Sequence, residues 1–178
     1  MKAIADMTVE EIAGLICETL GKEGITATLT GGGCVAVWTA GKYVSRDLDF
    51  IEEGVVSRRK LKTVLATIGF REKNRYFVHP ETEFFVEFPT GPLMVGDERV
   101  EAVGFLATCA GRLRLLSPTD SVKDRLAAYF HWNDRQALEQ ALLVARSHPV
   151  DRDSIARWAK AEGAREKLAD FNNAIDSP

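Results

Sequence analysis

The chain has few of the residues that build disulfide frameworks or structural zinc sites. Its three cysteines, Cys17, Cys34 and Cys109, are odd in number and far apart, and none belongs to a CxxC or Cys/His spacing. The three histidines are scattered along the chain and share no spacing with one another. We therefore expect reduced cysteines in a cytoplasmic protein, with neither a disulfide framework nor a zinc site of clustered cysteines and histidines.

Long apolar runs and an excess of positive charge are missing as well. No run approaches the about 18 apolar residues of a membrane helix, and no signal peptide precedes the first expected helix, so no membrane contact is expected. A net charge of −3 argues against a generally basic nucleic-acid binder. With 178 residues, 46% of them hydrophobic, the chain can bury a core without disulfides. It is expected to form one domain, or one domain with a small appendage.

One stretch of the chain combines glycines with closely spaced carboxylates. Thr28 to Gly33 is predicted to be a strand that runs into the turn Gly31-Gly32-Gly33 and opens a short helix. A second strand follows, in which Asp47 and Asp49 alternate with Leu48 and Phe50. Because side chains alternate along a strand, the two aspartates should share one face while the apolar residues face the core.

The two features together predict a site for phosphate and a metal ion. Two aspartates on one face repel each other, and a divalent cation between them removes that repulsion. Glycines at a helix start let a phosphate approach the backbone N–H groups at the positive end of the helix. A tight turn without a ligand, or solvated aspartates paired with Arg46 or Lys42, would be the purely structural alternative.

The glycine turn, the gap of about one helix and the sequence Asp47-Leu48-Asp49-Phe50 resemble the DNA polymerase β-like nucleotidyltransferase superfamily. The sequence from Ser45 to Phe50 is most similar to the small prokaryotic branch that includes the AbiEii-type and minimal nucleotidyltransferase toxins. The resemblance implies a third carboxylate on a later strand. Glu87 can supply it, with Glu83 as a competitor of the same strand parity.

The resemblance also assigns roles to individual residues. Asp47, Asp49 and Glu87 would be catalytic and would hold Mg²⁺, with Mn²⁺ as an alternative, while Gly31 and Gly32 would cradle the phosphates. Ser45 and Lys123 are further candidates for nucleotide contact. Ser45 could instead cap the turn before its strand, and Lys123 could be an ordinary lysine on a helix surface.

The remaining pattern predicts an α+β fold, with a mixed sheet flanked by helices and followed by a helical appendage. Helix-start signals occur at Thr8, Ser57, Ser117 and Asp134. Short strands are expected around residues 75–78, 83–88, 93–95, 100–103 and 113–116. Helices then dominate, and the last three residues, 176–178, should fray. We therefore expect a nucleotidyltransferase-like core over 1–116 and a helical subdomain over 117–178.

The function that these expectations support is Mg²⁺-dependent transfer of an NMP from an NTP to an acceptor hydroxyl. The acceptor is left open between tRNA, a protein and a small molecule. Two other functional hypotheses stay open. One is a catalytically inactive member that binds a nucleotide or a protein through the same cleft, and the other is the toxin of a pair with a cognate antitoxin partner.

Overall fold

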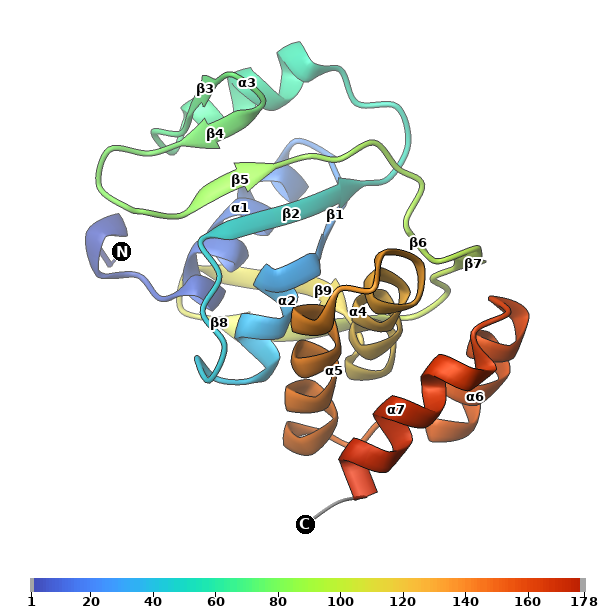
Figure 1. Cartoon of the computed structure of the whole chain (residues 1–178). Helices are drawn as coiled ribbons and strands as arrows, with labels where there is room; N and C mark the ends of the chain where they lie inside the picture. The colour runs from blue at the N-terminus through green and yellow to red at the C-terminus, as the bar shows by residue number, and fades with distance from the viewer. Residues whose placement is uncertain (1, 177–178) are drawn as a thin grey trace.

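The structure, a computed structural model, describes residues 2–176 and places helices around a central sheet (Figure 1). Its first part alternates helices and strands: the 3₁₀ helix Ile4–Asp6, α1 (Val9–Lys22), β1 (Ala27–Thr30), α2 (Gly31–Trp38), β2 (Asp47–Glu52) and α3 (Arg58–Ala66). Strands follow: β3 (Arg71–Lys73), β4 (Tyr76–Val78), β5 (Phe85–Glu87), β6 (Met94–Val95), β7 (Glu98–Arg99), β8 (Val103–Thr108) and β9 (Gly111–Leu116). The chain closes with four helices: α4 (Pro118–Trp132), α5 (Arg135–Ser147), α6 (Arg152–Ala161) and α7 (Arg165–Asp176). Of the end expected to fray, Asp176 closes α7, and residues 177 and 178 lie outside the described part.

In the described part of the chain, seven strands form one mixed sheet in the order β3-β4-β5-β2-β1-β9-β8. β1 is antiparallel to β2 and parallel to β9, and β2 is parallel to β5. The short strands β6 and β7 form a separate antiparallel hairpin. This arrangement confirms the predicted α+β class with a mixed sheet and flanking helices.

Two strands, β3 and β7 (Glu98–Arg99), were not predicted from the sequence, and a third, β8, was placed too early. β3 (Arg71–Lys73) consists of charged residues without any apolar alternation, and it is a strand because it pairs with β4. The strand expected at residues 100–103 instead runs over Val103–Thr108, where Gly104 interrupts the pattern. β8 is held in place by its antiparallel pairing with β9.

One face of the sheet carries the core. Leu29, Leu48, Phe50, Val86 and Leu115 are all fully buried, and strand pairing aligns Leu29 with Phe50 and Leu48 with Val86. Helices α1 and α2 contact the strands, and α3 packs against α1 and β3. The opposite side of β2 and β5 carries Asp47, Asp49 and Glu87 and is called the acid face below.

The helix starts agree with the capping residues read from the sequence. Thr8 and Glu11 form a capping box, in which Glu11 accepts a hydrogen bond from the backbone N–H of Thr8 at 2.8 Å. Ser57 caps α3, and Asp134 caps α5 by accepting from the N–H of Ala137 at 3.1 Å. Such caps satisfy backbone donors that have no partner within their own helix, which explains why they can be predicted locally.

The four closing helices gather at one side of the molecule, drawn in orange and red in Figure 1, next to α2. The change from strands to helices falls at Ser117, which caps α4. The β6–β7 hairpin contacts these helices, because the indole N–H of Trp158 donates to the carbonyl of Val95 at 3.0 Å. The division into units 1–116 and 117–178 stays a prediction.

Two expectations from composition can be compared directly with the structure. Cys17, Cys34 and Cys109 are all free cysteines. Among residues 2–176, no helix has both the length and the apolar character that are needed to cross a bilayer.

Candidate active site

Strand pairing brings three carboxylates together on the acid face. Asp47 and Asp49 alternate with the buried Leu48 and Phe50 along β2. In the parallel pairing of β2 with β5, Asp49 is the register partner of Glu87. One carboxylate oxygen of each acid lies within 4.8 Å of those of the other two, so the three side chains can share one cation.

Glu83, the competing candidate for the third acid, takes a different partner. It lies before β5 begins, and its carboxylate forms an ion pair with Arg46 at 2.9 Å. Arg46 therefore pairs with Glu83, and this ion pair does not support the structural alternative in which Arg46 neutralises the two aspartates. The register of β5 against β2 selects Glu87 as the neighbour of the two aspartates.

The electrostatics of the cluster favour a bound cation. Burial raises the pKa of Asp49 to about 7, with further contributions from the charges of Asp47 and Glu87, while Arg125 opposes the shift. Burial and then the charge of Glu87 also raise the pKa of Asp47, and Arg75 opposes that shift. Three negative charges in this cluster therefore repel one another unless a cation binds between the carboxylates.

An unsatisfied atom allows a test of whether a metal ion fits. Oδ1 of Asp47 is buried and has no hydrogen-bond partner, although buried polar atoms normally have one. Carboxylate oxygens are the ligands that Mg²⁺ and Mn²⁺ prefer. Three such groups from adjacent strands, with one oxygen still unpartnered, fit a divalent metal ion of this kind.

The glycine turn lies directly against this cluster. Gly31 is the first residue of α2 and has φ = 62°, a left-handed conformation that glycine adopts at little cost. A Cβ at this position would lie 2.7 Å from Oδ2 of Asp49, which no real side chain tolerates without a shift. The helix thus starts at Gly31, two residues before the expected start at Gly33, and its first backbone amides belong to the glycine turn.

The next two glycines have different surroundings. A Cβ at Gly32 would lie 3.3 Å from Oγ of Ser45, a tight distance but one that a small shift can relieve. A Cβ at Gly33 would lie 2.9 Å from Leu48 and 3.0 Å from the carbonyl oxygen of Asp47. Gly33 therefore permits the close packing of α2 on β2, and Gly31 and Gly32 form the part of the turn nearest to the carboxylates and Ser45.

The Ser45 side chain binds the backbone at the start of β2. Its hydroxyl donates to the carbonyl oxygen of Asp47 at 3.0 Å and accepts from the N–H of the same residue at 3.2 Å. These contacts correspond to the capping alternative read from the sequence, and they orient the backbone that carries the first aspartate. The contact of Ser45 with a nucleotide stays a prediction.

Lys123, the other candidate for nucleotide contact, forms ion pairs with two acidic side chains. Its ammonium group is 2.9 Å from Glu98 and 3.7 Å from Asp120, and only 3% of the side chain is exposed. The ion pair with Glu98 connects α4 with the β6–β7 hairpin, whereas the one with Asp120 lies within α4. A contact between Lys123 and a nucleotide phosphate stays a prediction.

Two arginines near the cluster were not identified from the sequence. Nε of Arg75, on the turn between β3 and β4, is 3.3 Å from Oε1 of Glu87. Arg125 on α4 is half-buried and donates to Asp124 and Gln140. The sequence does contain a signal for Arg125, because this arginine directly precedes Leu126, a residue on the inward face of the predicted helix. A surface arginine on a hairpin turn gives no comparable signal.

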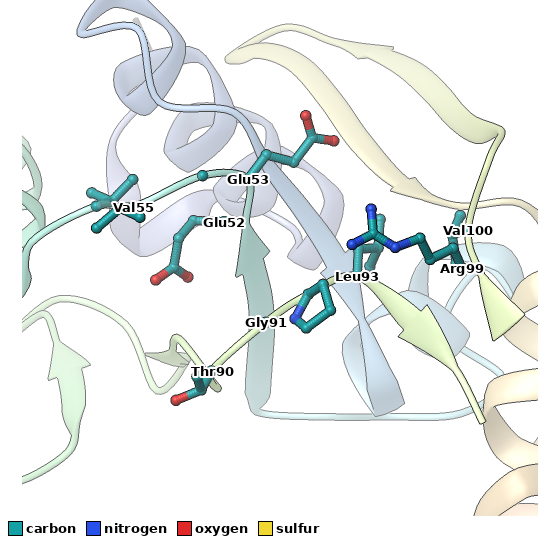
Figure 2. A pocket seen from close by; sticks show the side chains of 11 residues that line it. Glu52, Glu53, Val55, Thr90, Gly91, Leu93, Arg99 and Val100 are labelled. Carbon is teal, nitrogen blue, oxygen red and sulfur yellow. The ribbon is translucent and has the colours of Figure 1, made fainter. Parts of the chain in front are cut away.

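A cavity lies at the other end of β2 (Figure 2). Its volume is about 690 Å³, and its walls include the segments that continue β2 and β5, residues 52–56 and 90–93. In Figure 2 the carboxylates of Glu52 and Glu53 point to opposite sides of the chain. The three clustered carboxylates do not line this cavity, so it is separate from the candidate active site.

Comparisons with solved structures identify the fold. A nucleotidyltransferase-like antigenic protein from Paracoccidioides brasiliensis matches with a TM-score of 0.63 and 13% identity, over 94% of this chain and 91% of that one. The solution structure of the antibiotic-resistance factor ANT(2″)-Ia matches with a TM-score of 0.54 and 14% identity, over 93% and 96%. No protein-family model and no curated protein matches the sequence.

The chain therefore has a nucleotidyltransferase-like fold over nearly its whole length. The fold agrees with the one that the resemblance in the sequence implies. Assignment to the AbiEii-type branch stays a prediction.

Proposed function

We propose that the protein is a metal-dependent nucleotidyltransferase that moves an NMP from an NTP to an acceptor hydroxyl. One observation carries this proposal: carboxylate oxygens of Asp47, Asp49 and Glu87 lie within 4.8 Å of one another. The glycine turn at the start of α2 supports it, because Gly31 lies directly against Asp49. The nucleotidyltransferase-like fold of the chain is consistent with the same chemistry.

In this proposal each group in the site has a distinct task. Asp47, Asp49 and Glu87 would hold Mg²⁺ or Mn²⁺, which would supply charge neutralisation for the phosphates and the developing oxyanion. The N–H groups of the Gly31-Gly32 turn would bind the β- and γ-phosphates at the positive end of α2. Glu87, at the end of β5, would accept the proton of the attacking hydroxyl.

The proposed reaction is an in-line substitution at the α-phosphorus. The acceptor oxygen forms a bond to that phosphorus while the bond to the bridging oxygen of the β-phosphate breaks, and pyrophosphate leaves. Most of the rate enhancement would come from positioning and charge neutralisation rather than from covalent chemistry by the protein. This fits a site that contains carboxylates and a glycine turn.

Three classes of acceptor hydroxyl are compatible with the proposed reaction. The similar solved structure of ANT(2″)-Ia is that of an antibiotic-resistance factor, which makes a small-molecule hydroxyl the first acceptor class to examine. tRNA and protein hydroxyls are the other two classes, and a toxin with an antitoxin partner would act on one of them.

A transfer assay with an α-labelled NTP tests the proposal. The protein would be incubated with Mg²⁺, each NTP in turn, and pools of aminoglycosides, tRNA or total protein. We expect label in one acceptor pool for the wild type, and none for Asp49→Asn. Binding of the NTP without any transfer would favour a catalytically inactive binding protein, and absence of NTP binding would contradict the nucleotide site itself.

A further inference from the structure

Arg75 lies beside the third carboxylate of the cluster. It lies on the turn between β3 and β4, next to Asn74. Its guanidinium is 3.3 Å from Glu87, and 70% of the side chain is exposed. Among residues 2–176, no other lysine or arginine lies within 4.0 Å of the three clustered carboxylates.

The backbone at this position is held firmly, although the guanidinium is exposed. Nη2 of Arg58 donates to the carbonyl oxygen of Arg75 at 2.5 Å, and Nε of Arg58 is itself bound to Glu72 at 2.8 Å. Nη2 of Arg75 donates to the hydroxyl of Tyr76 at 2.5 Å. The guanidinium carries five N–H donors in total, so donors remain for a further anion.

The glycine turn and Arg75 lie at opposite ends of the candidate site. The sheet order is β4-β5-β2-β1 across this region. Gly31 follows β1 and lies against Asp49 of β2, whereas Arg75 precedes β4 and contacts Glu87 of β5. The carboxylates therefore separate the turn that would bind the β- and γ-phosphates from the guanidinium.

This order fixes which phosphate the guanidinium can meet. Glu87 is one of the three residues that would hold the metal ion, so a phosphate bound at that ion would lie near the Glu87 carboxylate. The guanidinium already forms an ion pair with the same carboxylate, so it would lie beside the phosphate at the Glu87 end. If the terminal phosphates occupy the glycine turn, that phosphate is the α-phosphate, the one under attack.

We propose that Arg75 binds the α-phosphate of the nucleotide, after exchanging its contact with Glu87 for one with a non-bridging phosphate oxygen. This inference rests on the proposed function, because it assumes an NTP in the site. Arginine suits this task, since its planar fork can donate two parallel hydrogen bonds to phosphate oxygens. The alternative is that Arg75 only neutralises Glu87 while no metal ion is bound.

Binding measurements distinguish these two roles without the acceptor. Non-hydrolysable α,β-methylene analogues of the four NTPs would be titrated in saturating Mg²⁺, and Mn²⁺ alone would be titrated by electron paramagnetic resonance. We expect Arg75→Ala to weaken binding of the preferred analogue about 10- to 100-fold, which is the loss of a charge-assisted hydrogen bond. Its Mn²⁺ affinity should stay equal or rise, because a competing cation has gone.

Arg71→Ala is the matched control, because Arg71 is an exposed arginine on β3 of the same hairpin. It should change neither affinity, and Arg75→Lys should retain part of the nucleotide affinity. Unchanged or tighter analogue binding by Arg75→Ala, together with tighter Mn²⁺ binding, would overturn the proposal in favour of a counter-ion. If the wild type binds Mn²⁺ but none of the four analogues, the proposed function itself fails and the role of Arg75 fails with it.

Discussion

Asp49 and Glu87 face each other at the same level of two adjacent parallel strands, β2 and β5. Parallel pairing places both side chains on one side of the sheet, and Asp47, two residues before Asp49, lies on that side as well. Two strands that are separated in the chain by the 32 residues 53–84 thus build one carboxylate cluster. The predictions below address the ion that such a cluster should bind, the turn beside it and the charges within it.

Mg²⁺ and an NTP should together raise the melting temperature of the wild type. A ligand at 100 times its Kd adds about 2.7 kcal/mol of stability, which corresponds to roughly 5–10 °C for a chain of this size. The double variant Asp47→Asn, Asp49→Asn should fold but lose this shift in a thermal denaturation assay. Glu83→Gln, at an acid outside the cluster, should keep it. A full shift in the double variant would show that the ion binds elsewhere.

Gly31→Ala should destabilise the protein and abolish nucleotide binding. The left-handed backbone costs an L-residue about 1–2 kcal/mol, and the new Cβ would collide with Asp49. The measurements are urea unfolding and NTP titration. Gly21→Ala in α1 is the control, because a Cβ there meets no atom within 4 Å and should stabilise by about 0.4–1 kcal/mol.

Gly32→Val tests whether the glycine turn binds phosphate or only has a structural role. The branched side chain would crowd Ser45 and cover the backbone where a phosphate must approach. We expect a modest loss of stability and a large loss of NTP affinity, measured by calorimetric titration of the folded variant. Wild-type affinity in a folded Gly32→Val protein would show that the turn only connects β1 with α2.

The metal-free protein should become less stable as the pH rises from about 4 to about 7. The pKa of Asp49 is about 7 in the folded protein, above its value of 3.8 in the unfolded chain. Between these values the folded state keeps a proton that the unfolded state releases, so the free energy of unfolding falls with pH. Asp49→Asn should flatten this profile and be more stable than the wild type at pH 8.

The same unfolding measurement in Mg²⁺ is the control for that pH profile. A bound divalent ion favours the ionised carboxylates, so Mg²⁺ should reduce the loss of stability of the wild type toward pH 8. The flatter profile of Asp49→Asn should not change with Mg²⁺. Urea unfolding curves at several pH values, with EDTA or with Mg²⁺, give the required free energies. A wild-type profile in EDTA that is flat between pH 4 and 7 would contradict the raised pKa of Asp49.

Glu87→Gln should affect turnover more than nucleotide binding. The substitution keeps the shape of the side chain but removes the charge and the proton acceptor, so we expect kcat to fall by about 10²–10⁴-fold. The Kd of a non-hydrolysable NTP analogue should change far less. Equal losses in kcat and in affinity would assign Glu87 to ground-state binding instead of to the activation of the acceptor.

Local patterns in the sequence determined much of this protein. The alternation of Asp47 and Asp49 with Leu48 and Phe50 predicted β2, because alternation is a property of the strand itself. The capping residues Ser57 and Asp134 predicted helix starts for the same reason, since a cap acts on its own first turn.

Only the tertiary structure decided which distant residues meet. The sequence left Glu83 and Glu87 as competitors, and the register between β2 and β5 selected Glu87 as the neighbour of Asp49. Lys123 looked suited to a nucleotide contact, whereas the packing of α4 pairs it with Glu98. Arg75 reaches the site because β4 pairs with β5. Strand order and register arise from contacts between remote segments, and no local periodicity encodes them.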